Sequence, residues 1–123
     1  EKIAGIANDR PAITPDLGPS SGKLAIVGWG STYGAIHGAV NELNKDGKDV
    51  AHIHVRQMSP LPRGFEELLR SYDHILVPEM NMGQLVKLIR AEYLIDAKGL
   101  NQVTGKPFKV GKIKQTALDM LEN

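Results

Sequence analysis

The sequence contains no cysteine among its 123 residues. This absence excludes disulfide bonds, thiolate metal sites and cysteine-ligated iron–sulfur clusters from the chain. It also favours a reducing compartment, and we expect a cytoplasmic protein. A chain of this length forms about one domain and buries a core that needs no covalent cross-link.

The net charge is also small, and the sequence has no long apolar run. Fifteen basic and fourteen acidic residues leave a formal charge of +1, without a long run of either sign. This balance is not typical of proteins that bind nucleic acid or anionic membranes. The longest apolar run has four residues, Leu24 to Val27, so we expect neither a membrane span nor a signal peptide. Because the first residue is Glu1, we expect a fragment, a processed chain or a subcloned domain.

The first 22 residues differ from the rest in composition. Proline, glycine and serine interrupt them repeatedly, as in a linker. The short apolar stretch at 2–7 is compatible with an added edge strand, and a disordered or domain-crossing tail is the alternative. We therefore divide the chain into a linker or edge-strand segment, 1–22, and an α/β domain, 23–123.

From Lys23 onward the pattern alternates between strand and helix. The runs 24–27, 50–55 and 74–77 predict buried strands, and a weak fourth strand is predicted near 101–104. Four helices are predicted from apolar residues at helical spacing, namely Ile36, Ala39, Val40 and Leu43, then Phe65, Leu68, Leu69 and Tyr72, then Leu85, Val86, Leu88, Ile89 and Tyr93, and finally Ile113, Ala117, Met120 and Leu121. This alternation implies parallel strands with right-handed crossovers in a three-layer α/β/α sandwich.

Single residues predict where these elements begin and end. Ser31 is predicted to cap the first helix and Gly47 to end it. Pro78 is predicted to end the third strand. Asn81 and Gln84 have the spacing of a capping box at the start of the next helix.

The glycine-rich loop 28–34 lies at the end of a predicted strand, where open parallel sheets bind ligands. The dinucleotide fingerprint requires G-x-G-x-x-G and an acidic residue about twenty positions later. Here Gly34 falls one position late, and the second strand leads into Arg56 rather than an acidic residue. We therefore interpret Gly28 and Gly30 as permitting a tight turn, and Gly34 as permitting close packing of helix on sheet. An NADP site that places a 2′-phosphate on Arg56 is the alternative.

Histidines are the candidate metal ligands. His52 and His54 have the spacing of two ligands on one strand face, whereas Ala51, Ile53 and Val55 share the other face. Since no nearby carboxylate completes a site, we favour hydrogen bonds to backbone or water and predict no metal. A catalytic histidine would also need a nucleophile such as Ser31 within reach.

Glu79 and Trp29 are the most informative single residues. Glu79 follows a buried strand and precedes a helix, so its carboxylate is suited to bind the positive end of that helix. Contact with a partner domain and a catalytic role are the alternatives. Trp29 is the only tryptophan, and its position in a loop is compatible with an interface anchor or with packing under the adjacent helix.

Several segments, in order along the chain, resemble one family. They are residues 2–7, the loop 28–34, Ser59-Pro60-Leu61-Pro62, the stretch 77–85, and Gly105-Lys106-Pro107-Phe108. Together they resemble the C-terminal domain of the α subunit of 2-oxoglutarate:ferredoxin oxidoreductase. The resemblance implies the fold of the transketolase C-terminal domain, a mostly parallel five-stranded sheet with one antiparallel edge strand.

The resemblance also implies the function of a parent enzyme. Such an enzyme decarboxylates a 2-oxoacid on thiamine diphosphate and Mg²⁺, passes electrons through an iron–sulfur cluster to ferredoxin, and forms the acyl-coenzyme A. The cofactors are implied to sit on other domains, so we expect this chain to bind none of them and to carry no catalytic residue. Its implied partners are the preceding pyrimidine-binding domain and a β subunit.

The favoured function is therefore a structural and assembly domain. The alternatives are a free-standing Rossmann-like module that binds a nucleotide or coenzyme A, and the equivalent domain of a pyruvate oxidoreductase, a transketolase or the β chain of a 2-oxoacid dehydrogenase. The candidate interface residues are Trp29, Ser31, Thr32, Glu79, Asn81 and Gln84.

Overall fold

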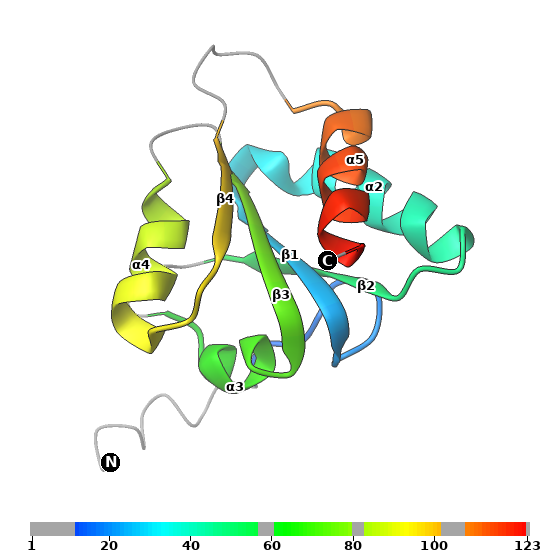
Figure 1. Ribbon diagram of the computed structural model, residues 1–123. Helices are drawn as coiled ribbons and strands as arrows, with labels where there is room; N and C mark the ends of the chain where they lie inside the picture. Colours follow the sequence, from blue (N-terminus) through cyan, green and yellow to red (C-terminus); the bar gives the residue numbers. More distant parts are fainter. Residues whose placement is uncertain (1–11, 57–60, 80–82, 102–107, 123) are drawn as a thin grey trace.

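Four parallel strands form the central sheet of the computed structural model, in the order β2–β1–β3–β4 (Figure 1). The structure describes residues 12–56, 61–79, 83–101 and 108–122. The strands are β1 (Gly22–Trp29), β2 (Val50–Val55), β3 (Tyr72–Glu79) and β4 (Lys98–Asn101). The predicted runs at 24–27, 50–55 and 74–77 therefore all lie in strands.

Helices cover both faces of the sheet. A 3₁₀ turn, η1 (Gly30–Thr32), leads into α2 (Tyr33–Lys45), which packs with α5 (Val110–Leu121) on one face. On the other face lie α3 (Phe65–Leu69) and α4 (Gln84–Tyr93) (Figure 1). The predicted three-layer α/β/α architecture is confirmed. None of the described helices is long and apolar enough to cross a membrane.

The two faces of β2 divide as its sequence predicts. Ala51, Ile53 and Val55 are buried against α3 and α4, whereas His52 and His54 lie on the opposite face. Because side chains alternate along a strand, this division follows from the two-residue period alone.

A fifth strand is not formed by the described residues. Its place at the outer edge of β2 is taken by one antiparallel bridge, between Leu17 and His52. Pro15 and Pro19 flank Leu17 and have no backbone N–H, so a longer ladder cannot form there. The stretch 2–7, predicted as an edge strand or a tail, lies outside the described residues.

Three element boundaries differ from the prediction. β3 continues through Pro78 to Glu79, because beyond Leu76 it pairs only with β4 and a proline is tolerated there. Tyr72 belongs to β3 rather than to α3, which ends at Leu69. β4 begins at Lys98, earlier than the predicted 101–104, of which residues 102–104 are not described.

The C-terminal end of α4 predicts a stabilising substitution. Leu94 has φ 56° and is 85% exposed, so it is strained and makes little apolar contact. We expect Leu94→Gly to raise the free energy of unfolding by about 0.5–1 kcal/mol, because glycine adopts this conformation without strain. Urea unfolding followed by circular dichroism measures the change. A loss of stability would show that Leu94 makes contacts that offset its strain.

Candidate functional site

The glycine-rich loop 28–34 forms a tight connection from β1 to α2. A Cβ atom at Gly28 would collide with the side chains of Ile36 and Thr32, so Gly28 is the glycine that permits close packing of helix on strand. Gly30 has φ 66°, which confirms its predicted role in the turn. The prediction for Gly34 is wrong, because nothing lies within 4 Å of the position of its Cβ.

The predicted cap of this helix is also wrong. α2 begins after η1 with Thr32 at the N-cap position and without a side-chain cap. Ser31 lies within η1 and is exposed. The hydroxyl of Thr32 instead donates to the carbonyl oxygen of Trp29 over 3.0 Å. At the other end, Gly47 follows the last turn with φ 85°, as predicted.

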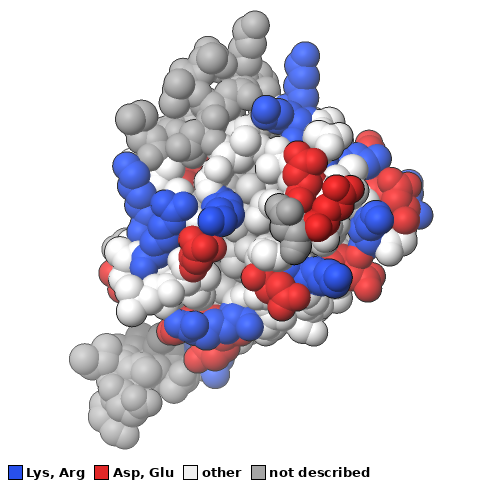
Figure 2. Space-filling model, in the orientation of Figure 1, with Lys and Arg blue, Asp and Glu red and all other residues white. Residues whose placement is uncertain are grey.

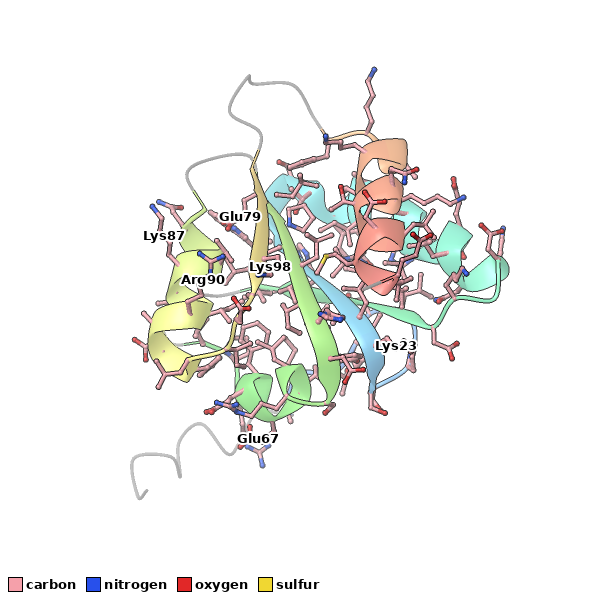
Figure 3. The ribbon with its side chains drawn as sticks, viewed as in Figure 1. Lys23, Glu67, Glu79, Lys87, Arg90 and Lys98 are labelled. Carbon is pink, nitrogen blue, oxygen red and sulfur yellow. The ribbon has the colours of Figure 1, made fainter. Side chains whose placement is uncertain are left out.

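Glu79 connects three parts of the chain at the carboxyl end of β3 (Figure 3). Its Oε1 accepts from the indole N–H of Trp29 at 2.9 Å and from the backbone N–H of Leu85 at 2.8 Å. Its Oε2 accepts from the backbone N–H of Val86 at 3.0 Å. With only 1% of its surface exposed, the carboxylate is held by these donors and by the positive end of α4.

This geometry confirms that Glu79 binds the start of the following helix. It corrects the predicted capping box, because the N-cap of α4 is Gly83 and makes no side-chain cap, while Asn81 lies outside the described residues. The donors at the helix start are satisfied by a carboxylate that precedes the helix by several residues. A local cap motif could not reveal this contact.

Five of the six candidate interface residues lie in the described part of the chain and divide by exposure. Ser31 and Gln84 are exposed and Trp29 is half-buried, packing against the core under α3 and α4. Thr32 and Glu79 are buried within the chain and support the two loops from beneath. Among these five residues, only Trp29, Ser31 and Gln84 are accessible to solvent.

A second polar group lies on the other face of the sheet. We call Tyr33, His37, His52 and His54 the imidazole cluster. The ring of Tyr33 stacks on His37 with centroids 5.2 Å apart and lies 4.8 Å from the rings of both His52 and His54. Nδ1 of His37 lies 3.1 Å from Nδ1 of His52, so one of these atoms donates and the other accepts.

Burial favours the neutral form of His52 and His54, the two imidazoles of this cluster on β2. His52 is fully buried, and its burial lowers the pKa to about 4, while the Asp16 carboxylate opposes this shift. The pKa of His54 is also lowered by burial and by Arg56. Nε2 of His52 and Nδ1 of His54 are buried without a hydrogen-bond partner in the described part of the chain. The expectation for these side chains is a hydrogen bond to backbone or water, and Nδ1 of His52 instead contacts His37.

Asp16 is a residue that sequence reasoning missed. Its Oδ1 accepts from the backbone N–H of His54 at 3.2 Å, and its Oδ2 pairs with Arg56 at 2.8 Å. Burial raises the pKa of Asp16, but the bonds from Arg56 and His54 outweigh this effect and the net shift is downward. No sequence signal places Asp16 beside a strand that begins 34 positions later.

Among the described residues, neither polar group is arranged as a metal centre. Within the described ranges, no three histidine, cysteine or acidic side chains are arranged to hold a metal ion. Nor is a hydrogen bond between Ser31 and His52 present in this part of the chain. On the face shown in Figure 2, basic and acidic side chains of the described residues are interspersed.

Comparisons with known proteins assign the fold and the family. Residues 22–113 match the family described as pyruvate:ferredoxin oxidoreductase core domain II. The chain is 36% identical over 120 residues to the 2-oxoglutarate oxidoreductase subunit KorA of Mycobacterium tuberculosis, covering 95% of this chain and 18% of that protein. The chain thus spans less than a fifth of this curated relative.

Solved structures agree on the fold. A 2-oxoglutarate:ferredoxin oxidoreductase from Magnetococcus marinus, with 2-oxoglutarate, coenzyme A and succinyl-CoA bound, superposes with a TM-score of 0.85 at 24% identity, over 98% of this chain and 21% of that one. A split-gene transketolase superposes with a TM-score of 0.64 at 17% identity, over 92% of this chain and 46% of that one. The chain therefore belongs to the family of pyruvate:ferredoxin oxidoreductase core domain II, as its resemblance to 2-oxoglutarate:ferredoxin oxidoreductase α subunits predicts.

Proposed function

We propose that this chain is a non-catalytic structural and assembly domain in the α subunit of a 2-oxoacid:ferredoxin oxidoreductase. The parent enzyme is proposed to be cytoplasmic and to decarboxylate 2-oxoglutarate oxidatively to an acyl-coenzyme A. The family match and the identity to a 2-oxoglutarate oxidoreductase subunit support this proposal. One observation carries it: the two carboxylate oxygens of Glu79 accept hydrogen bonds from Trp29 and from the start of α4. The most buried carboxylate of the site therefore has a structural role.

We assign the cofactors of the parent enzyme to its other domains. We expect the whole enzyme to use thiamine diphosphate, Mg²⁺, an iron–sulfur cluster and coenzyme A. The side chains of this domain do not fit the metal groups among them, because it has no cysteine and its described residues offer no three-ligand site. We therefore propose no catalytic role for the described residues of this chain.

The partners are the preceding pyrimidine-binding domain and the β subunit, and ferredoxin binds to the whole enzyme. We assign the contact to the loop that carries Trp29 and Ser31 and to the start of α4 at Gln84. These side chains lie at the carboxyl ends of neighbouring strands and reach solvent in the isolated domain. A half-buried tryptophan on a rigid support is a suitable anchor for such a contact.

A bulky charge at Ser31 tests the assignment. In the full α subunit, we expect Ser31→Arg to weaken association with the β subunit or with the preceding domain by about tenfold or more, which corresponds to about 1.4 kcal/mol. Co-purification and analytical ultracentrifugation measure subunit association, and limited proteolysis reports domain docking. Ser21→Arg is the matched control, because Ser21 is exposed at the opposite end of β1.

Equal behaviour of the two variants in every assay would contradict the interface.

A ligand titration addresses the domain's role separately. If NADPH, ATP or coenzyme A at a hundredfold excess over its dissociation constant stabilised the isolated chain by about 2.7 kcal/mol, a binding module would replace the assembly role. Trp29 fluorescence and the melting temperature report such binding.

A further inference from the structure

The imidazole cluster lies beside the segment that precedes the sheet. We call residues 12–21 the edge segment. It follows the outer edge of β2, where the backbone N–H of His52 donates to the carbonyl of Leu17 at 2.8 Å and the carbonyl of His52 accepts from Asp16 at 2.7 Å. One residue of β2 thus holds the edge segment with its backbone and belongs to the imidazole cluster with its side chain.

Further contacts attach the edge segment near the same place. The Asp16 carboxylate receives the N–H of His54, and Leu17 packs against the core under α2. A separate contact lies nearer the sheet centre, where the hydroxyl of Tyr72 donates to the carbonyl of Pro19 at 2.6 Å. Around Asp16 and Leu17 the edge segment therefore depends chiefly on the position of β2 at His52 and His54. Ile13 is held separately, because its backbone N–H donates to the carbonyl of Arg63 at 2.9 Å and its side chain packs against the core under α3 and α4.

The protonation state of His52 decides whether its ring can stay in this position. A neutral ring can carry its proton on Nδ1 and donate it to His37, and in this tautomer the buried Nε2 is an acceptor without a partner among the described residues. A protonated ring would carry an N–H at Nε2 that has no acceptor within the described residues, and a charge that is fully buried. The N–H without an acceptor and the buried charge both raise the free energy of the folded state, and movement of β2 toward water lets both be solvated.

The groups that face His52 do not compensate this charge fully. The ring of His52 is faced from α2 by His37 and Tyr33, and from β2 by His54 and Arg56. The nearby carboxylate is that of Asp16 in the edge segment, and it is itself paired with Arg56. The neighbouring strand β1 places apolar Ile26 beside it. On α5, Lys114 is paired with Glu42 and Asp46 at the far end of α2.

We propose that the imidazole cluster is a proton-sensitive latch, which holds the edge segment on β2 while His52 is neutral and releases it when His52 is protonated. Release detaches the part of the edge segment around Asp16 and Leu17 and leaves the central strands β1 and β3 paired. The domain thereby gains a pH-dependent connection to the chain that leads into it. This inference does not depend on the proposed function.

Hydrogen exchange tests the latch directly. At pH 7.5 and 5.0, after correction for intrinsic rates, we measure the protection of the amides of Asp16, Leu17, His52 and His54. We expect their protection to fall by more than about tenfold at pH 5.0, while amides in the β1–β3 ladder keep theirs. Protection that is unchanged, or that falls equally in the β1–β3 ladder, would overturn the latch.

Variants distinguish release of the edge segment by protonation of His52 from a weakening of its contacts that does not depend on pH. His52→Leu, with His52→Gln as a second uncharged replacement if the first does not fold, is expected to remove most of the pH dependence of protection at Leu17. Tyr72→Phe is the contrasting variant, because it removes the bond to Pro19 without a group that titrates in this range, the pKa of Tyr72 being raised to about 12 by burial. It should lower protection of the edge segment by a similar factor at both pH values. If the uncharged variants lost protection at pH 5.0 as the wild type does, the imidazole of His52 would not be the sensor.

Discussion

Replacing Glu79 with glutamine is expected to lower the free energy of unfolding by about 2–4 kcal/mol. The carboxylate accepts from three N–H groups through both of its oxygens, and an amide has only one acceptor oxygen. In either orientation, the NH₂ group of glutamine meets an N–H of Trp29, Leu85 or Val86. The substitution also removes a negative charge from the start of α4. Urea unfolding at pH 7.5, followed by circular dichroism, measures the change.

Two further variants show whether this loss arises from the buried contact. Glu67→Gln removes a carboxylate from the exposed surface of α3 and should change stability by less than about 0.5 kcal/mol (Figure 3). Trp29→Phe keeps an aromatic ring but removes one of the three donors, and we expect a loss of about 1–1.5 kcal/mol. Similar stabilities of the Glu79 and Glu67 variants would be incompatible with the capping role of Glu79.

Acidification is expected to destabilise the domain by about 3 kcal/mol between pH 6.5 and pH 4 through His52 alone. Burial lowers the pKa of His52 from 6.5 to about 4 in the folded chain. In this interval the unfolded chain binds a proton that the folded chain does not, so stability is complete above pH 6.5 and falls as the pH decreases. The lowered pKa of His54 acts in the same direction, and that of Asp16 adds a loss below pH 3.8.

Urea unfolding at pH 7.5, 6.5, 5.5 and 4.5 measures this dependence. His52→Leu should remove most of the slope over the same interval, because leucine does not titrate and only the contribution of His54 remains. His74→Gln is the control, since His74 lies on β3 and is separated from β2 by β1. The assignment to His52 would fail if His52→Leu retained the wild-type slope, or if His74→Gln removed it.

Local patterns determined most of the fold. The apolar runs and the helical spacing specify the strands, the faces of β2 and the helices α2, α4 and α5, because burial of one face imposes a period that the sequence itself displays. The same reasoning placed Tyr72 in a helix, since a buried residue at the start of a strand satisfies the spacing equally well. Ordered motifs along the chain also identified the family before any contact was known.

Contacts between distant segments were decided by the tertiary structure. The chemistry of Glu79 indicated a helix cap, but the bond to Trp29, 50 positions away, depends on β1 and β3 lying side by side. In the imidazole cluster, His37 meets His52 because α2 crosses the sheet face that carries the even-numbered residues of β2. Asp16 reaches His54 only because the edge segment turns back along β2. A sequence specifies which groups must be buried, whereas the partners that satisfy them are chosen by how the layers pack.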